Sequence, residues 1–425
     1  MDFQSISRHD RRGFFRAAAL GMGASLSWLT PVGRLLADQA EKSRRPAQSI
    51  ILLWLDGGPS QLETFDPHPD TRIAAGTRAI ETAVKGIRLA EGYGHLAGQM
   101  RSVTLVRSMV SKEGDHERGT YVMKTGYRPD PTVEHPSIGA ICCHELPVGR
   151  TDIPRHISIL TGHRPSRGGF LGGEYNAFLV GDPKDRLPDV TSPVPAPREA
   201  ARVNDLEVAE RAFARGRMGR VRMTGHRETL ARARVMMTSE QLRAFDVSQE
   251  PAVLRAEYGD TPFGRGCLAA RRLIEVGARC VEVTLGGWDA HVNNHEIHRA
   301  RAKALDPAFA ALLRDLADRR LLKRTVVLCC GEFGRSPRVN PLGGRDHWPS
   351  GFSLALAGGG IRGGLALGET DPEGIQGPVR PTTIEDVHAT ILSALGLDPG
   401  KANTAPATGR PIKLSAGRPI RELLA

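Results

Sequence analysis

The sequence has little cysteine: six residues among 425, four of which form two adjacent pairs. Their spacing gives neither a disulfide framework nor a zinc knuckle. Several lie in apolar runs, such as Cys329 and Cys330 at the end of Val-Val-Leu-Cys-Cys. We therefore expect the cysteines to be small buried hydrophobic residues that carry no information on the redox compartment.

Nucleic-acid-binding motifs are also absent, although 58 basic residues against 47 acidic ones give a formal net charge of +11. There is no paired Cys/His finger, no aromatic RNA-binding signature and no long Lys/Arg run. Without such a motif we expect no nucleic-acid partner. The basic surface can instead attract phosphate or sulfate esters. The apolar fraction of 40% and the charged fraction of 25% are those of an ordinary globular protein.

No segment of the mature chain is long and apolar enough to span a membrane, but the N-terminus has the features of an export signal. Arg11 and Arg12 are adjacent, Phe14 follows, and a Gly/Ala-rich apolar stretch continues to about Val32. This pattern is typical of a twin-arginine signal peptide, which we place at residues 1–37. We expect passage through the twin-arginine translocon to the periplasm or the exterior, and an uncleaved, membrane-anchoring leader stays open.

Short apolar runs alternate with segments of helical spacing. Residues 50–55, 279–285 and 325–330 are apolar, and each run ends in a glycine-containing loop, as buried parallel strands do. Further strands are expected over 103–106, 156–160, 178–180 and 352–357, and helices over 119–125, 137–145, 263–276, 297–322 and 384–395. The alternation predicts an α/β fold with a mostly parallel central sheet and helices on both faces. We expect one domain over 49–425, with a helical insertion at about 199–245.

Carboxylate and histidine side chains follow three expected strands at their carboxyl ends, where open α/β sheets bind ligands. Asp56 follows the first strand, and Glu332 follows the strand at 325–330. Asp289 and His291 lie in Gly-Gly-Trp-Asp-Ala-His after the strand at 279–285. Asp and His two residues apart can both reach one metal ion if the turn is tight, and the glycines allow such a turn.

Two more motifs extend this set of candidate ligands. Asp346 and His347 lie in a Gly/Pro-rich loop, and His116 lies in a charged segment that enters a helix. Carboxylate and imidazole suit a divalent metal. We take Zn first and keep Mn, Mg and Ca as alternatives.

A bound metal would lower the pKa of a water molecule and polarise a phosphoryl or similar oxygen. Arg118, Arg345 or Arg335 could then hold the other oxygens of an anion by bidentate hydrogen bonds. Structural roles are the alternative: Asp56 as a turn or cap residue, and Glu332 as a salt-bridge partner of Arg335.

The order of these motifs resembles domain-of-unknown-function family 1501, exported bacterial proteins grouped with the alkaline phosphatase and sulfatase superfamily. The motifs are Leu-Asp-Gly-Gly-Pro-Ser (55–60), Gly-Asp-His-Glu-Arg-Gly-Thr-Tyr (114–121), Thr-Gly-Tyr-Arg-Pro (125–129), Gly-Gly-Trp-Asp-Ala-His (286–291), Gly-Glu-Phe-Gly-Arg-Ser-Pro (331–337) and Gly-Arg-Asp-His-Trp-Pro (344–349). The resemblance covers nearly the whole mature chain.

The resemblance implies a three-layer α/β/α sandwich of the alkaline phosphatase type, with a metal site at the strand ends. Asp56 is similar to the metal aspartate of the first strand, and Asp289 and His291 resemble the Asp/His metal pair. His347 resembles the last metal histidine. Glu332 falls where sulfatases and phosphatases have Asp-His after a strand, which suggests one metal ion in place of two.

One departure from the superfamily concerns the nucleophile. In sulfatases, the helix that ends in Thr-Gly begins with a nucleophilic Cys or Ser, and counting back from Thr125 gives His116. Thr120 lies one turn further into the helix. His116 could itself attack, could bind metal, or could mark a site that has lost catalysis.

These observations leave three functions open. The first is an exported, metal-dependent hydrolase of phosphate or sulfate esters, acting on a small anionic ester or on a sulfated or phosphorylated glycan. The second is a non-catalytic, metal-containing protein that binds a glycan or an envelope partner on the same fold. The third is a metal-dependent mutase or transferase.

Overall fold

The computed structural model describes residues 46–149, 151–162, 164–216 and 226–425. The signal peptide expected at 1–37 lies outside these residues. Residues Pro46–Ala425 form one compact unit. Among the helices of the described part, none combines the length and the apolar character that crossing a membrane requires.

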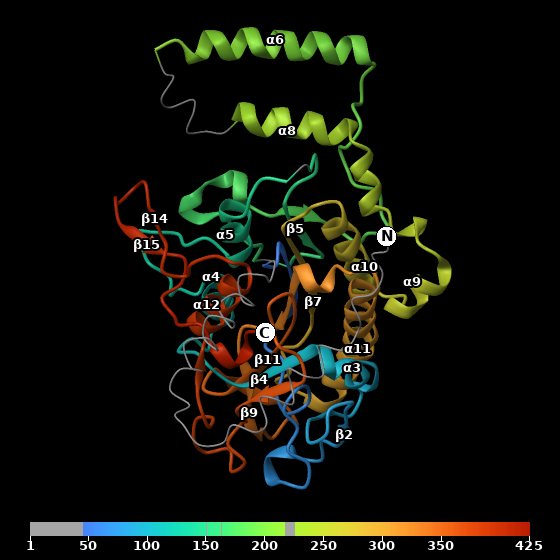
Figure 1. The fold of residues 1–425 in the computed structure, drawn as a ribbon, viewed down its shortest axis with the longest axis vertical. Coiled ribbons are helices and arrows are strands. Elements are labelled where there is room, and N and C mark those ends of the chain that lie inside the picture. The colour runs from blue at the N-terminus through green and yellow to red at the C-terminus, as the bar shows by residue number, and fades with distance from the viewer. Residues whose placement is uncertain (1–45, 150, 163, 217–225) are drawn as a thin grey trace, which may run out of the picture. The chain divides into compact units, whose positions relative to one another are not determined.

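A sheet of nine strands runs through the described residues, in the order β12-β4-β11-β8-β1-β7-β5-β6, with β13 beside β4 (Figure 1). The strands are β1 (Ser49–Asp56), β4 (Val103–Val110), β5 (His156–Ile159), β6 (Phe178–Val180), β7 (Cys280–Gly286), β8 (Thr325–Cys330), β11 (Phe352–Gly358), β12 (Leu365–Leu367) and β13 (Thr382–Thr383). Strand β11 is antiparallel to both of its neighbours, and the other pairs are parallel. The predicted α/β class with a mostly parallel sheet is confirmed.

Strand β1 shows why both faces of the sheet need cover. Ile51 and Leu53 belong to the hydrophobic core on one face, and Leu52 and Trp54 belong to the core on the other. All four are at most 3% exposed. Because successive side chains of a strand point to opposite faces, a continuous apolar run can be buried only between two layers.

Helices supply these layers on each side (Figure 1). One core contains residues of α3 (Gly94–Gln99), α10 (Pro262–Glu275) and α11 (Asn294–Asp318). The other contains residues of α4 (His116–Thr125), α5 (Ile138–Glu145) and α12 (Ile384–Ala394). The result is the expected three-layer α/β/α arrangement. All six cysteines are buried and free, as predicted.

The segment expected as a helical insertion contains α6 (Ala196–Ala214), α8 (His226–Thr238) and a 3-10 helix (Glu240–Phe245), and α9 (Ala252–Tyr258) follows. Helix α6 buries only Ala214, so its charged residues form a solvated face. Small strand pairs lie outside the main sheet: β2 (Ala79–Glu81) with β3 (Arg88–Ala90), β9 (Gly334–Val339) with β10 (Arg345–Trp348), and β14 (Ala402–Thr404) with β15 (Pro411–Lys413). The β9–β10 hairpin was not predicted, because its strands are short, charged and interrupted by Pro337.

A buried ion pair fixes α4 over β7. Lys124 Nζ lies 2.8 Å from Glu282 Oε1, and the two side chains are 6% and 1% exposed. Ser166 Oγ donates to Glu282 Oε2 at 2.6 Å. Burial by itself raises the pKa of Glu282, but Lys124 and these hydrogen bonds bring it below its ordinary value. The pair thus holds the helix that begins at His116 against the strand that leads to Asp289.

Removing one partner should leave the other buried and unpaired. We predict that Lys124→Met lowers the free energy of unfolding by about 3–5 kcal/mol. Urea unfolding followed by circular dichroism measures this change. The matched control is Lys112→Met at an exposed lysine, expected to change the free energy by less than about 0.5 kcal/mol. Equal effects of the two substitutions would contradict the role of the pair.

Candidate metal centre

The loops that follow β1, β7 and β8 meet at the carboxyl edge of the sheet. Gly57 has a φ of 118°, and a Cβ at this position would lie 2.5 Å from the backbone nitrogen of Asp289. Only glycine therefore allows the β1 loop to approach the β7 loop so closely. Gly57 N donates to Glu332 Oε1 at 3.0 Å, which joins the β8 loop to the other two.

His116 is placed by the start of α4. Asp115 caps the helix, because its Oδ1 accepts hydrogen bonds from the backbone nitrogens of Glu117 and Arg118 at 3.0 and 3.1 Å. The His116 ring lies between two carboxylates. Its Nδ1 is 2.7 Å from Glu332 Oε1, and its Nε2 is 3.4 Å from Asp289 Oδ2.

The β9–β10 hairpin carries His347 to the same place. Arg345 N donates to Ala290 O at 2.9 Å, and a Cβ at Gly344 would lie 1.8 Å from His291 O. Strand β10 is therefore packed directly against the loop that follows β7. This contact explains how histidines 56 residues apart in sequence become neighbours.

Two histidine nitrogens converge on one oxygen of Asp289. His291 Nε2 lies 3.1 Å and His347 Nε2 lies 3.3 Å from Asp289 Oδ1, and the two Nε2 atoms are 3.0 Å apart. On the far side of each ring, His347 Nδ1 is 2.7 Å from Gly114 O, and His291 Nδ1 is 3.2 Å from Asp346 Oδ1.

These outer contacts favour one tautomer of each ring. A carbonyl oxygen only accepts, so Nδ1 of His347 carries the proton and Nε2 of the neutral ring is a bare acceptor. The Asp346 carboxylate favours the same tautomer in His291. An imidazole that donates from one nitrogen to a carbonyl or carboxylate and presents the other is the usual form of a metal-ligating histidine.

The pKa values of His116 and His347 shift in opposite directions. Burial lowers the pKa of His347 and so favours its neutral form. The hydrogen bond with Glu332 raises the pKa of His116 and so favours its protonated form. Burial alone would raise the pKa of Asp289, but Arg335, whose Nη2 donates to Oδ1 at 2.5 Å, brings it below its ordinary value.

The donor set fits a first-row divalent metal ion. Ligand atoms of His116, Asp289 and His347 lie within 4.8 Å of one another, and His291 contacts two of the three. One carboxylate with two imidazoles gives a catalytic type of site that keeps a position open. Adding His116 would give a closed site of one carboxylate and three imidazoles.

Three of the predicted ligands, Asp56, Glu332 and Asp346, contribute no atom to the group formed by Asp289, His291 and His347. Asp56 Oδ1 accepts a hydrogen bond from Trp54 Nε1 at 3.1 Å, so its carboxylate turns toward its own strand. Glu332 is only 1% exposed and is occupied by Gly57 N and His116. It orients a histidine in the same way that Asp346 orients His291.

The structure does not bring Arg345 to the cluster. Its guanidinium is fully buried, and it donates to Glu63 Oε1 at 2.9 Å and to backbone carbonyls such as Ile73 O. This orientation could not be predicted from the sequence, because an arginine beside Asp346 and His347 could equally point toward the site or into the core. Arg345 therefore stabilises the hairpin that carries His347 and cannot contact an anion at the cluster.

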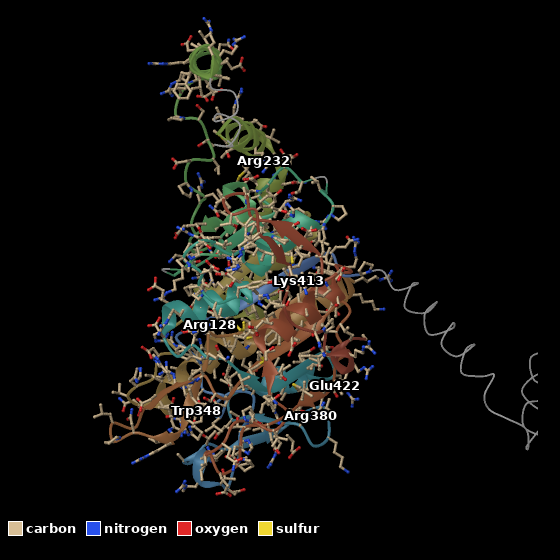
Figure 2. The ribbon with its side chains drawn as sticks, turned by 90° about the vertical axis from the view of Figure 1, so that its left-hand side faces the viewer. Arg128, Arg232, Trp348, Arg380, Lys413 and Glu422 are labelled. Atoms are coloured by element: carbon tan, nitrogen blue, oxygen red, sulfur yellow. The ribbon has the colours of Figure 1, made fainter. Side chains whose placement is uncertain are left out.

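Arg118 stays near the site but at the surface. It is 62% exposed and lies 3.3 Å from Glu113, which also binds Arg128 (Figure 2) at 2.6 Å. Of the three candidate arginines, only Arg335 contacts one of the candidate metal ligands, Asp289. It is fully buried, bonds Asp289, and donates to the carbonyl oxygens of Gly57 and Gly58.

The protein family described as "Protein of unknown function (DUF1501)" matches residues 47–424. No curated protein matches the sequence. Similar solved structures include the PsFucS1 sulfatase from Pseudoalteromonas sp., 13% identical, with 88% of this chain and 72% of that chain covered and a TM-score of 0.38. The alkaline phosphatase from the Antarctic bacterium TAB5 is 11% identical, with 84% and 100% covered and a TM-score of 0.36.

The lipoteichoic acid synthase LtaP from Listeria monocytogenes is 10% identical, with 88% of this chain and 76% of that chain covered and a TM-score of 0.36. Identities and scores this low carry over no activity to this chain. The chemistry of the cluster has to be judged from its own residues.

The buried Glu63–Arg345 pair makes stability depend on pH. Burial alone would raise the pKa of Glu63, but Arg345 and neighbouring groups lower it to about 2, from an ordinary 4.5. Ionised Glu63 therefore stabilises the fold above pH 4.5, and this contribution, on the order of 3 kcal/mol, is lost as the pH falls toward 2. We predict that Glu63→Gln unfolds with a flatter pH dependence than wild type between pH 5 and 3, measured by urea titration. Parallel pH profiles would contradict the assignment.

Proposed function

The chain belongs to the DUF1501 family, and we propose that it is an exported, divalent-metal-dependent hydrolase of phosphate or sulfate esters. The observation that carries the proposal is the convergence of His291 Nε2, His347 Nε2 and Asp289 Oδ1, each held by a buried or hydrogen-bonded partner. The twin-arginine pattern at residues 1–37 supports export to the periplasm or the exterior.

Asp289, His291 and His347 would hold the metal ion, with Zn first and Mn, Mg or Ca as alternatives. A bound divalent ion supplies a polarised ester oxygen and a water of lowered pKa. The remaining contacts of this set belong to the protein: Arg335 keeps Asp289 ionised, and Gly114 O keeps His347 in the tautomer that exposes Nε2.

His116 would serve as the proton donor. Its Nε2 lies near Oδ2 of Asp289, whereas the two ligand histidines contact Oδ1. Its Nδ1 faces the Glu332 carboxylate, so both ring nitrogens are next to a carboxylate. This environment favours an imidazolium, and protonation of the leaving oxygen is the task of a general acid in ester cleavage. Glu332, anchored by Gly57 N, sets the orientation of the ring.

Two surface arginines that contact Glu113, one in the first turn of α4 and one after its end, support an anionic substrate. Arg118 and Arg128 both contact Glu113, whose side chain is only 4% exposed. A buried carboxylate thus anchors two exposed guanidinium groups, which keep donors available for an anion. A sulfated or phosphorylated glycan is the substrate class that we assign.

A second function rests on the same distances. His116 is close enough to Asp289 and His347 to be a further metal ligand. The site would then be closed, as structural metal sites are, and the protein would bind a glycan or an envelope partner without turnover.

The first prediction concerns metal content. An Asp289→Ala/His291→Ala double variant should lose the metal that wild type retains through purification, because two of the three ligands are removed. Inductively coupled plasma mass spectrometry measures it, with exposed Lys303→Ala as the control that should keep full occupancy. Equal metal in wild type and the double variant would overturn the site.

The second prediction separates the two functions. His116→Gln should keep its metal and lose kcat for 4-nitrophenyl phosphate or sulfate by about 10²–10⁴-fold, as expected for a lost general acid. If His116→Gln instead loses metal as His291→Ala does, and wild type turns over neither ester, the closed-site binding protein is the better account.

A further inference from the structure

A cavity of about 490 Å³ opens beside the start of α11, and residues of the metal cluster do not line it. Its walls include Glu63, Thr77, Arg78, His295 and Arg299. The volume is far larger than one water molecule needs, and it lies in the range of small-molecule binding sites. Nothing in the chemistry proposed above uses it.

Glu63 gives the cavity an unmet acceptor. The residue is 6% exposed, and its Oε1 accepts from Thr77 Oγ1 at 2.8 Å and from Arg345 Nη2 at 2.9 Å. Its Oε2 makes no hydrogen bond with any described residue. His295 Nε2 lies 3.4 Å from Oε1 and is likewise without a hydrogen-bond partner in the described chain.

A second layer of polar side chains lies behind Glu63. Ser60 and Asn294 are fully buried, do not line the cavity, and lie close enough to Glu63 to lower its pKa through their side chains. No contact of Ser60 Oγ or of the Asn294 side chain meets the full geometry of a hydrogen bond among the described residues. At the cavity wall itself, the unpaired atoms are Glu63 Oε2 and His295 Nε2, and an unpaired buried polar atom favours a polar guest.

The mixture of groups restricts the chemistry of that guest. Of the residues that line the cavity, Glu63 offers an acceptor at Oε2, and Arg299 is a donor. A bare cation would be repelled by Arg345, which already pairs with the Glu63 carboxylate. A simple anion would meet Glu63 itself and the Arg78 guanidinium that Glu91 already binds at 2.5 Å. Hydroxyl groups donate and accept at once, which suits this wall.

We propose that this cavity binds a sugar ring through its hydroxyl groups. Glu63 Oε2 accepts from one hydroxyl, and His295 and Arg299 contact its neighbours. The cavity is close to the metal site in sequence: His295, in the first turn of α11, follows His291 by four residues, and Arg345, which binds Glu63, precedes Asp346. The inference rests on the proposed function only in making this ring part of an ester-bearing glycan.

Saturation-transfer difference NMR tests the proposal with three neutral probes: D-glucose, D-galactose and L-fucose. At least one should give saturation transfer with the full chain. His295→Ala and Arg299→Ala should each raise its Kd by roughly tenfold, the effect of about 1.4 kcal/mol. Lys303→Ala, on the same helix and outside the cavity walls, should leave the Kd unchanged.

Absence of transfer from all three sugars overturns the proposal, and so does a Kd that neither cavity variant changes. Circular dichroism and metal content on the same samples exclude misfolding, since both variants lie at the partly exposed wall. Metal-dependent ester cleavage without sugar binding would refute only the sugar site. Sugar binding in a chain that holds no metal would refute only the hydrolase.

Discussion

The Nε2 atoms of His291 and His347 face each other at 3.0 Å beside Oδ1 of Asp289. Gly114 O and Asp346 contact the opposite sides of the two rings, which favours the tautomers that present Nε2. A divalent ion between the two nitrogens and the carboxylate would be attracted by all three, in addition to the Arg335 guanidinium that already contacts Asp289 Oδ1. The remaining features of the site maintain this arrangement: close backbone approach at Gly57, the Arg335 contact with Asp289, and the seating of β10 on the β7 loop.

Two fully buried arginines, Arg335 and Arg345, stabilise different parts of the site. Arg335 joins the β1 loop to Asp289, and Arg345 joins the hairpin that carries His347 to Glu63. Burying a guanidinium is costly unless its donors are paired, and each of these donates to several backbone carbonyls as well as to a carboxylate. Arg335 Nη1 also donates to Arg345 O, so the contacts that support Asp289 and those that support Glu63 are linked through the β9–β10 hairpin.

The fold was largely predictable because its central strands are continuous apolar runs that end in glycine-containing loops. The convergence of those loops at the carboxyl edge follows from parallel pairing alone, so Asp289 and His291 could be placed in advance. The direction of each side chain could not. The Asp56 carboxylate turns toward Trp54, and Glu332 orients His116. Arg335 and Arg345, each of which follows a glycine, donate to backbone carbonyls inside the fold. Except for the local contact of Asp56, these contacts join segments distant in sequence, and the β9–β10 hairpin that carries Arg335, Arg345 and His347 has no apolar periodicity.

X-ray absorption at the zinc edge of the zinc-loaded full chain would test the central claim most directly. If His291 and His347 bind metal through Nε2 beside Asp289, the spectrum will show the outer-shell scattering of at least two imidazole rings and a low-coordinate nitrogen/oxygen shell. The Asp289→Ala/His291→Ala variant should lose that signal. A wild-type spectrum with oxygen neighbours only and no imidazole scattering would show that the histidines meet for another reason and would contradict the account.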